Sequence, residues 1–296
     1  MRIGTVMGTS GPGQTLDDLI NFARKAEAAG LDDLWMANIF SFDAIATLGL
    51  IGREVPRIGL GTAVTPTYPR HPTALAQQAL TTAAAAAGRF SLGIGLSHRL
   101  VIEDMFGFSY DKPAKHMREY LSVLMPLVRD ETANFDGDQY RVRGVKMDIP
   151  GSEGMPVLIA ALGPVMLKIA RDMADGTITW MVGEKTLAGH IAPSIGADKT
   201  LVAGVPMVLT TNVEDAKAKI DQQLAIYGQL PSYRAMLDRE GAATPSDVAL
   251  VGDENALRSG MERYRQAGVT HFNAAITPTE PGAFERTLEF LSSLKG

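Results

Sequence analysis

The 296-residue chain has a formal net charge of −5, 46% hydrophobic and 21% charged residues, and no cysteine. This balance is typical of a globular protein with a large apolar core, and the mildly acidic charge argues against nucleic acid or an anionic membrane as a partner. A small-molecule partner is therefore expected. Because cysteine is absent, disulfides, zinc-thiolate sites and cysteine nucleophiles are excluded, and the reducing cytoplasm is the expected compartment.

The chain opens with MRIGTVMG, a strand-like run without the apolar stretch and cleavage site of a signal peptide. No run of about 18 apolar residues predicts a membrane span. Short aliphatic runs alternate with longer helical patterns, which predicts parallel strands joined by crossover helices. The eight expected strands cover residues 3–7, 31–37, 57–64, 90–97, 156–161, 177–181, 201–209 and 270–276.

Capping residues and glycines mark the helix boundaries. Thr15 predicts the start of the first helix, and Gly30 predicts its end as a C′ glycine. An inserted hairpin is expected over 134–147, where Asp136-Gly137 is a turn pattern. Further helices are expected over 43–54, 72–87 and 113–129, from 164, from 281, and as several helices within 213–268.

Eight consecutive βα units favour closure into a (β/α)₈ TIM barrel with insertions over a doubly wound open sheet, as one domain spanning residues 1–296. In such barrels the active site lies at the C-terminal ends of the strands. The residues expected there are Gly8-Thr9-Ser10, Asn38-Ile39-Phe40, Val64-Thr65-Pro66, Ser97-His98, Ala161-Leu162-Gly163, Trp180-Met181 and Thr277.

Several common motifs are incomplete. In GTSGPGQT, Gln14 stands where a phosphate-binding P-loop requires lysine. The stretch from Gly93 lacks the third glycine of a dinucleotide fingerprint, and Arg99 breaks the nucleophile-elbow pattern after Ser97. The five histidines show no metal-ligand spacing, so no metal site is expected. These observations disfavour hydrolases and metalloenzymes.

Three segments resemble one known family in its own order along the chain. The run IGLGTAV at 58–64, followed by YPRHP at 68–72, is similar to the third strand and helix entry of luciferase-like oxidoreductases. GRFSLGIG at 88–95 resembles their fourth strand, and AALGP at 160–164 with ADG at 174–176 resembles their fifth strand and the turn to the sixth. The length and motifs are most similar to the branch that uses coenzyme F420, an 8-hydroxy-5-deazaflavin; another branch uses FMN.

The resemblance implies positions for the cofactor. A non-proline cis peptide is implied between Ala63 and Val64, behind the cofactor ring. Residues 95–98 match the loop beside the ribityl and phosphate portion, and Leu162-Gly163 match a second phosphate contact at a helix start. The expected cofactor-binding residues are Asn38, Ala63, Val64, Thr65, Gly95, Leu96, Ser97, His98, Ala161, Leu162, Gly163 and Trp180.

The departure from the family lies at Asn38-Ile39, where members that oxidise sugar phosphates carry Asp-His with the histidine as base. Ile39 cannot move a proton. His98 is the catalytic candidate, because an imidazole with an unperturbed pKa of about 6.5 can transfer protons. The alternative for His98 is a loop histidine that hydrogen-bonds cofactor phosphate or backbone.

Other side chains have two interpretations each. Asn38 either contacts the ring edge or caps its loop, and Trp180 either lines the pocket or packs in the core. Trp35 is expected as core filler, and Arg70-His71 as a locally hydrogen-bonded helix entry. Glu103, Asp104 and His116 are expected at the solvated surface.

The sequence thus predicts a coenzyme F420-dependent oxidoreductase, run as a reductase that transfers hydride between the deazaflavin and a small organic substrate. The family resemblance also implies a homodimer. The alternatives are an FMN-dependent luciferase-like monooxygenase and a flavin- or deazaflavin-binding protein without catalysis.

Overall fold

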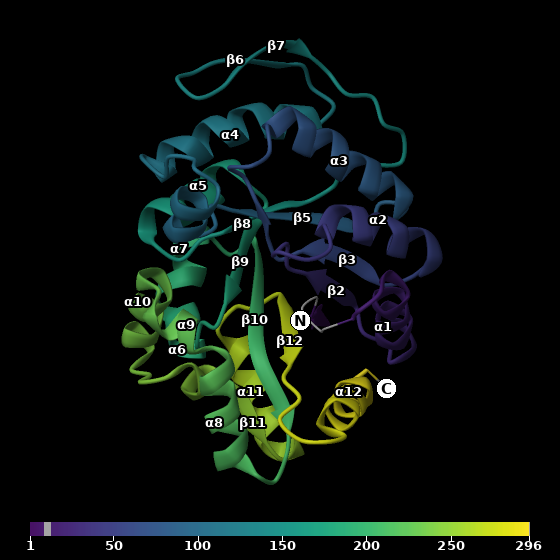
Figure 1. Cartoon of the computed structure of the whole chain (residues 1–296), viewed down its shortest axis with the longest axis vertical. Coiled ribbons are helices and arrows are strands. Elements are labelled where there is room, and N and C mark those ends of the chain that lie inside the picture. The colour runs from purple at the N-terminus through teal and green to yellow at the C-terminus, as the bar shows by residue number, and fades with distance from the viewer. Residues whose placement is uncertain (9–12, 296) are drawn as a thin grey trace.

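Eight parallel strands close into a ring in the computed structural model, which describes residues 1–8 and 13–295 (Figure 1). The hydrogen-bonded order is β10-β12-β1-β2-β3-β5-β8-β9, and β9 pairs back to β10. The predicted (β/α)₈ barrel is therefore confirmed, and the open-sheet alternative is wrong. The expected strand-end positions Thr9 and Ser10 lie outside the described residues.

The strands of the barrel occupy the predicted positions and are mostly shorter than predicted. Their bounds are β1 (Arg2–Met7), β2 (Asp33–Met36), β3 (Gly59–Thr62), β5 (Phe90–Gly95), β8 (Val157–Ala160), β9 (Gly176–Trp180), β10 (Thr200–Leu209) and β12 (His271–Ile276). The run predicted as one strand over 57–64 ends at Thr62, and the two-residue strand β4 (Thr65–Pro66) follows beside β5.

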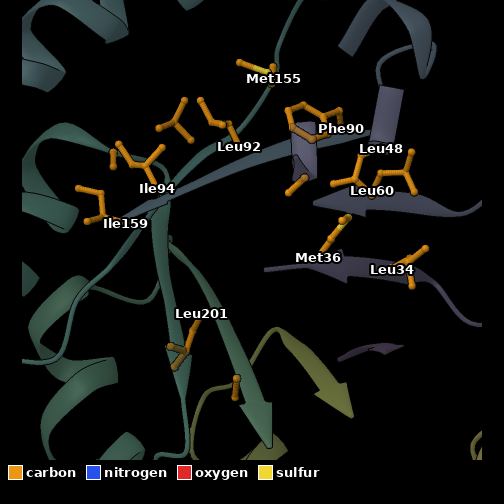
Figure 2. Packing of buried hydrophobic residues seen from close by; sticks show 14 of the residues in the cluster. Leu34, Met36, Leu48, Leu60, Phe90, Leu92, Ile94, Met155, Ile159 and Leu201 are labelled. Atoms are coloured by element: carbon orange, nitrogen blue, oxygen red, sulfur yellow. The ribbon is translucent and has the colours of Figure 1, made fainter. Parts of the chain in front are cut away.

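Side chains on the strands alternate between two apolar layers. On β2, Leu34 and Met36 belong to the cluster between the barrel and its helices, where Leu48 of the second helix also packs (Figure 2). Trp35, between them, lies inside the barrel and is 2% exposed, so its predicted core position is confirmed. Its buried partners there are Leu158, Ile178 and Val202.

Glycines make room for this interior. A Cβ placed on Gly61 would lie 2.4 Å from the Trp35 ring, and one on Gly93 would lie 2.0 Å from the Thr62 carbonyl oxygen. The narrow barrel is therefore filled by side chains below its C-terminal end.

The outer helices follow the strands. Their bounds are α1 (Leu16–Ala28), α2 (Ala44–Glu54), α3 (Pro72–Ala85), α4 (Pro113–Val128), α5 (Pro164–Met173), α6 (Glu184–Thr186), α7 (Ala192–Ile195), α8 (Val213–Gln223), α9 (Ala225–Gln229), α10 (Pro231–Glu240), α11 (Glu254–Gln266) and α12 (Ala283–Ser293). Helix α12 returns beside α1, where the Phe22 and Phe284 rings lie 5.6 Å apart (Figure 1).

Both predicted ends of the first helix are confirmed by their capping residues. Thr15 and Asp18 form a capping box at the start of α1, and Gly30 follows its end with a φ of 75°. The predicted hairpin is present as β6 (Ala133–Asp136) and β7 (Arg141–Val145), which lie outside α4 (Figure 1).

Irregular elements were not predicted. The π-helical turn η1 (Leu100–Met105) follows β5, and the π-helical turn η2 (Leu187–Ile191) directly precedes α7. The segment 213–268, predicted as helices alone, also contains the 3₁₀ turn η3 (Pro245–Val248) and the strand β11 (Leu250–Gly252), which extends the sheet beside β10. Within residues 1–8 and 13–295, no helix is long and apolar enough to cross a membrane.

Candidate functional site

A cavity of about 880 Å³ opens at the C-terminal ends of the barrel strands. Its volume falls in the range that small-molecule and cofactor sites occupy. The loops after β1, β2, β5 and β8 contribute lining residues, and α9 and α10 cover one side. The cavity therefore lies at the C-terminal face of the barrel, where the sequence predicts the site.

The cavity brings together all the expected cofactor-binding residues except Thr65. Val64 and Pro66, on either side of Thr65, line the cavity. Because side chains alternate along an extended segment, Thr65 faces away from it and is fully buried. The lining residues from the expected set are Asn38, Ala63, Val64, Gly95, Leu96, Ser97, His98, Ala161, Leu162, Gly163 and Trp180.

One wall of the cavity is a smooth apolar surface. The peptide bond between Ala63 and Val64 is cis, as the resemblance implies, and both residues pack on the Trp35 cluster inside the barrel. A Cβ on Gly95 would lie 2.7 Å from a Val64 methyl and 3.2 Å from the Ala160 Cβ. Glycine at this position therefore lets the β5 backbone pack directly against the bulge, which leaves a surface suited to a flat ring.

His98 lies half-buried in the loop after β5. Its ring centroid lies 5.9 Å from that of Tyr233, and burial lowers its pKa below the ordinary value. The preceding Ser97 has a φ of 61°, and the Tyr110 hydroxyl donates a 3.2 Å hydrogen bond to the Ser97 carbonyl oxygen. The geometry therefore places a neutral imidazole at the cavity wall on a loop held by Tyr110.

The loop after β8 presents backbone groups to the cavity. Gly163 is the N-cap of α5, and a Cβ added to it would meet no atom of residues 1–8 and 13–295 within 4 Å. Pro164 occupies the first turn, and the hydrogen bonds of the helix begin with the Leu167 amide, which donates to the Gly163 carbonyl oxygen. The first-turn amides are thus available to an anion, which helix N-termini favour.

His190 supports this loop from η2. Its Nε2 lies 2.8 Å from the Leu162 carbonyl oxygen, so the ring donates from that nitrogen. His190 was not predicted as a functional residue. Its contact joins positions 28 residues apart, which no local pattern reveals.

Asn38 caps its loop and also lies in the cavity wall. It lines the cavity, and its side-chain oxygen accepts hydrogen bonds from the Ala44 amide at 3.0 Å and from Arg70 at 3.4 Å. Arg70 pairs with Asp43 at 2.6 Å, and His71 caps α3 by accepting from the Thr73 amide. The predicted local hydrogen bonding is confirmed for His71, whereas the Arg70 side chain bonds residues 27 and 32 positions earlier and lines the cavity.

Two unpaired polar atoms lie in the cavity wall. Among the described residues, the Trp180 indole nitrogen and the Asn273 side-chain oxygen are buried without a hydrogen-bond partner. Buried polar groups are normally paired, so both atoms are positioned to bond a ligand or water. Asn273 was not predicted, although it interrupts the apolar run of β12.

Aromatic residues from later segments were also missed. Tyr227 of α9 and Tyr233 of α10 line the cavity with their rings 5.2 Å apart at 89°, and Tyr227 meets Trp180 at 6.2 Å. Burial raises the pKa of both tyrosines, so their hydroxyls stay protonated at neutral pH. The helical segment that carries them showed no pattern pointing inward.

His116 was expected at the surface and is instead 2% exposed. It stacks on Tyr68 with ring centroids 3.9 Å apart and lies 2.9 Å from both Thr67 and Gln139. The hairpin covers this face of α4 and buries the ring. Of the other two residues expected at the surface, Asp104 is exposed, whereas Glu103 pairs with Arg99 and accepts from the Tyr110 amide.

A closed (β/α)₈ barrel with a non-proline cis peptide beneath a large cavity at its C-terminal end is the architecture that the resemblance implies for flavin-type oxidoreductases. Within residues 1–8 and 13–295 no cluster of three potential metal ligands occurs. Residues 1–271 match the model of the luciferase-like monooxygenase family, and the chain belongs to this family.

Three relatives are informative. A putative coenzyme F420-dependent oxidoreductase of Mycobacterium tuberculosis is 30% identical over 91% of this chain and 93% of that protein. The coenzyme F420-dependent tetrahydromethanopterin reductase of Methanopyrus kandleri superposes with a TM-score of 0.82 at 19% identity, covering 98% of this chain and 97% of that one. The oxygenating constituent of 3,6-diketocamphane monooxygenase of Pseudomonas putida, solved with FMN, superposes with a TM-score of 0.76 at 15% identity. The superposition covers 99% of this chain and 96% of that one.

Proposed function

We propose that this protein is a coenzyme F420-dependent oxidoreductase that transfers hydride between the deazaflavin and a small organic substrate, acting as a reductase. The observation that carries the proposal is the cavity itself, in which an apolar wall at Ala63-Val64 lies in the same space as the free amides at the start of α5. A flat ring fits the wall, and an anionic tail fits the helix start.

The residues present fit such a cofactor. Among the described residues, none would lie within 4 Å of a Cβ on Gly8 or on Gly163, so the backbone at both positions can approach a ligand closely. The unpaired Trp180 nitrogen and Asn273 oxygen offer a donor and an acceptor to polar atoms of a ring. F420 is preferred over FMN because a relative named for F420 matches nearly the whole chain at 30% identity.

When bound in reduced form, the deazaflavin supplies the hydride. The chain orients the reactants and keeps water out through its aromatic cover. We propose His98 as the proton-transfer residue. Since burial lowers its pKa, the ring is neutral at pH 7 and accepts a proton directly, whereas donation to a product first requires uptake of one from solvent.

We further propose that the chain works as a single barrel domain, as a homodimer and in the cytoplasm. The absence of cysteine supports a reducing compartment, because such a chain gains nothing from an oxidising one. Sedimentation of the purified protein at several concentrations would test the dimer.

The first experiment is a fluorescence titration of the purified protein with oxidised F420 and with FMN in parallel. Micromolar or tighter binding of F420, with weaker binding of FMN, is the expected outcome. A preference for FMN, with oxygen uptake in the presence of reduced FMN, would instead support the monooxygenase alternative. Binding of neither would overturn the cofactor proposal.

Turnover separates the enzyme from a binding protein. Reduced F420 is mixed with panels of ketones, enones and imines, and its oxidation is followed by absorbance. The reductase predicts substrate-dependent oxidation that His98→Ala slows by about a hundredfold, as loss of a general acid–base does. Tight binding with no turnover on any panel would favour a non-catalytic carrier.

A further inference from the structure

The cavity holds little charge for a substrate to meet. Of the residues that line it, Arg70 is the single Lys, Arg, Asp or Glu within the described chain, and its guanidinium is paired with Asp43 at 2.6 Å. It also donates to the Asn38 side-chain oxygen at 3.4 Å. A phosphate or carboxylate on a substrate would therefore have to break this pair or remain without a cation.

The mouth of the cavity is apolar and exposed. Ile39 and Phe40, after β2, are 55% and 62% exposed, and Phe106, after η1, is 39% exposed. All three line the cavity, and the Phe40 and Phe106 rings meet edge to face with centroids 6.0 Å apart. Leu100 and Met105 on η1 are also more than half exposed.

A group of exposed apolar side chains around a cavity marks a site that binds an apolar partner. Two different loops supply this group, and the contact between the Phe40 and Phe106 rings joins them. Ile39 also stands where the resemblance places a histidine in members that oxidise sugar phosphates. The mouth thus offers apolar contact area. At position 39, where a hydroxylated substrate would need a polar group, it presents the isoleucine side chain.

A second group of aromatic side chains lines the cavity. Tyr227 and Tyr233 stand perpendicular to each other, and the Trp180 ring adjoins Tyr227. Tyr233 also lies beside His98. Rings at these distances favour stacking and edge contacts with a flat unsaturated molecule.

Resting on the function proposed above, we propose that the substrate is an electrically neutral, predominantly apolar carbonyl or alkene compound that packs against the apolar rim formed by Phe40 and Phe106. These two side chains determine the preference by binding the apolar body of the substrate. The aromatic side of the cavity holds its unsaturated part beside His98.

The test is calorimetric titration with a matched pair of probes, neutral 2-acetylnaphthalene and anionic 6-acetyl-2-naphthoate, on the protein with and without saturating F420. In the presence of saturating F420, which occupies the amides at the start of α5, the neutral probe is expected to bind at least about tenfold more tightly, since the carboxylate finds no free cation among the described residues that line the cavity. Equal or tighter binding of the anion would overturn the proposal.

Variants at the mouth assign the preference to its residues. Phe40→Ala and Phe106→Ala should each weaken the neutral probe about five- to tenfold, and Phe40→Leu should restore part of the loss. Leu50→Ala is the matched control, because Leu50 on α2 is 49% exposed and lies away from the cavity lining. Unchanged probe affinity in both alanine variants would overturn the proposal.

Two further readouts separate the possible failures. The F420 titration of the same samples tests the cofactor. If the protein binds the neutral probe but shows no affinity for F420, the proposed function is refuted and the preference for a neutral ligand stands. Sedimentation of the alanine variants tests a rival occupant, a second copy of this chain. Dissociation of a dimer together with unchanged probe affinity would assign the apolar rim to a subunit interface and refute the substrate class.

Discussion

The hydroxyl of Tyr110 donates a 3.2 Å hydrogen bond to the backbone carbonyl oxygen of Ser97, thirteen positions earlier. Ser97 has a left-handed backbone, with a φ of 61°, directly before His98. Tyr110 is itself held by stacking on Tyr68 at 5.4 Å and by Arg99, whose guanidinium lies 5.3 Å from the ring. The tyrosine therefore fixes the loop that presents His98 to the cavity.

Removal of that hydroxyl should loosen the loop. We expect Tyr110→Phe to lose about 1 kcal/mol of unfolding free energy, as for one hydrogen bond, and to bind F420 about fivefold more weakly. Urea denaturation and fluorescence titration measure the two effects. Tyr140→Phe serves as a control, because Tyr140 packs on His116 outside the cavity lining. Wild-type F420 affinity in Tyr110→Phe would show that the loop holds its shape without the bond.

The bond between His190 and the Leu162 carbonyl oxygen should matter for the anionic part of the cofactor. His190→Ala frees the loop before α5, so we expect F420 affinity to fall about fivefold, equivalent to about 1 kcal/mol. His190→Gln keeps a donor and should recover most of the affinity. If the glutamine variant binds as weakly as the alanine variant, the hydrogen bond is not the cause.

Stability should fall as the solution is acidified below about pH 6.5, the ordinary histidine pKa. Burial lowers the pKa of His116, and the nearby Gln139 and Glu119 offset this only in part. The unfolded chain therefore binds the proton first, and the stability present above that pH is lost as pH falls, by at most about 1.4 kcal/mol per unit for one proton.

Denaturant melts between pH 7.5 and pH 5 measure this slope, roughly the range over which histidines titrate. His116→Gln should flatten it without abolishing it, because burial also lowers the pKa of His98 and His271. An identical slope in wild type and His116→Gln would mean that His116 is protonated equally in both states.

Gly93 is expected to tolerate no side chain. A Cβ there would lie 2.0 Å from the Thr62 carbonyl oxygen, so Gly93→Ala must separate β3 from β5. We expect a loss of roughly 3 kcal/mol or more in thermal or urea unfolding. Gly189→Ala is the control: its Cβ would meet no atom within 4 Å, and alanine in a helical segment should be neutral or slightly stabilising. Comparable losses in the two variants would contradict the steric account.

Much of the candidate site follows from strand ends. Once the sequence predicts parallel strands in a ring, the residues after them must gather at one face, and eleven of the twelve expected cofactor positions line the cavity. Thr65 is the exception because its orientation depends on the local alternation after the cis bond, which brings Val64 and Pro66 to the cavity instead. His116 is buried because the inserted hairpin folds over it. The residues next to His116 in the sequence do not reveal where that hairpin packs.

The sequence by itself determined the βα order and the caps at Thr15 and Gly30, because these depend on periodicity and short-range chemistry. The family was predicted from the resemblance of three segments to luciferase-like oxidoreductases, and the match of residues 1–271 confirms it. Only the tertiary structure decided that His190 supports Leu162, that Tyr227 and Tyr233 cover the cavity, and that Phe40 meets Phe106. Those contacts join loops and irregular helices distant in the chain. Such segments carry no repeating pattern, so their side chains find partners only when the closed barrel brings its strand ends together.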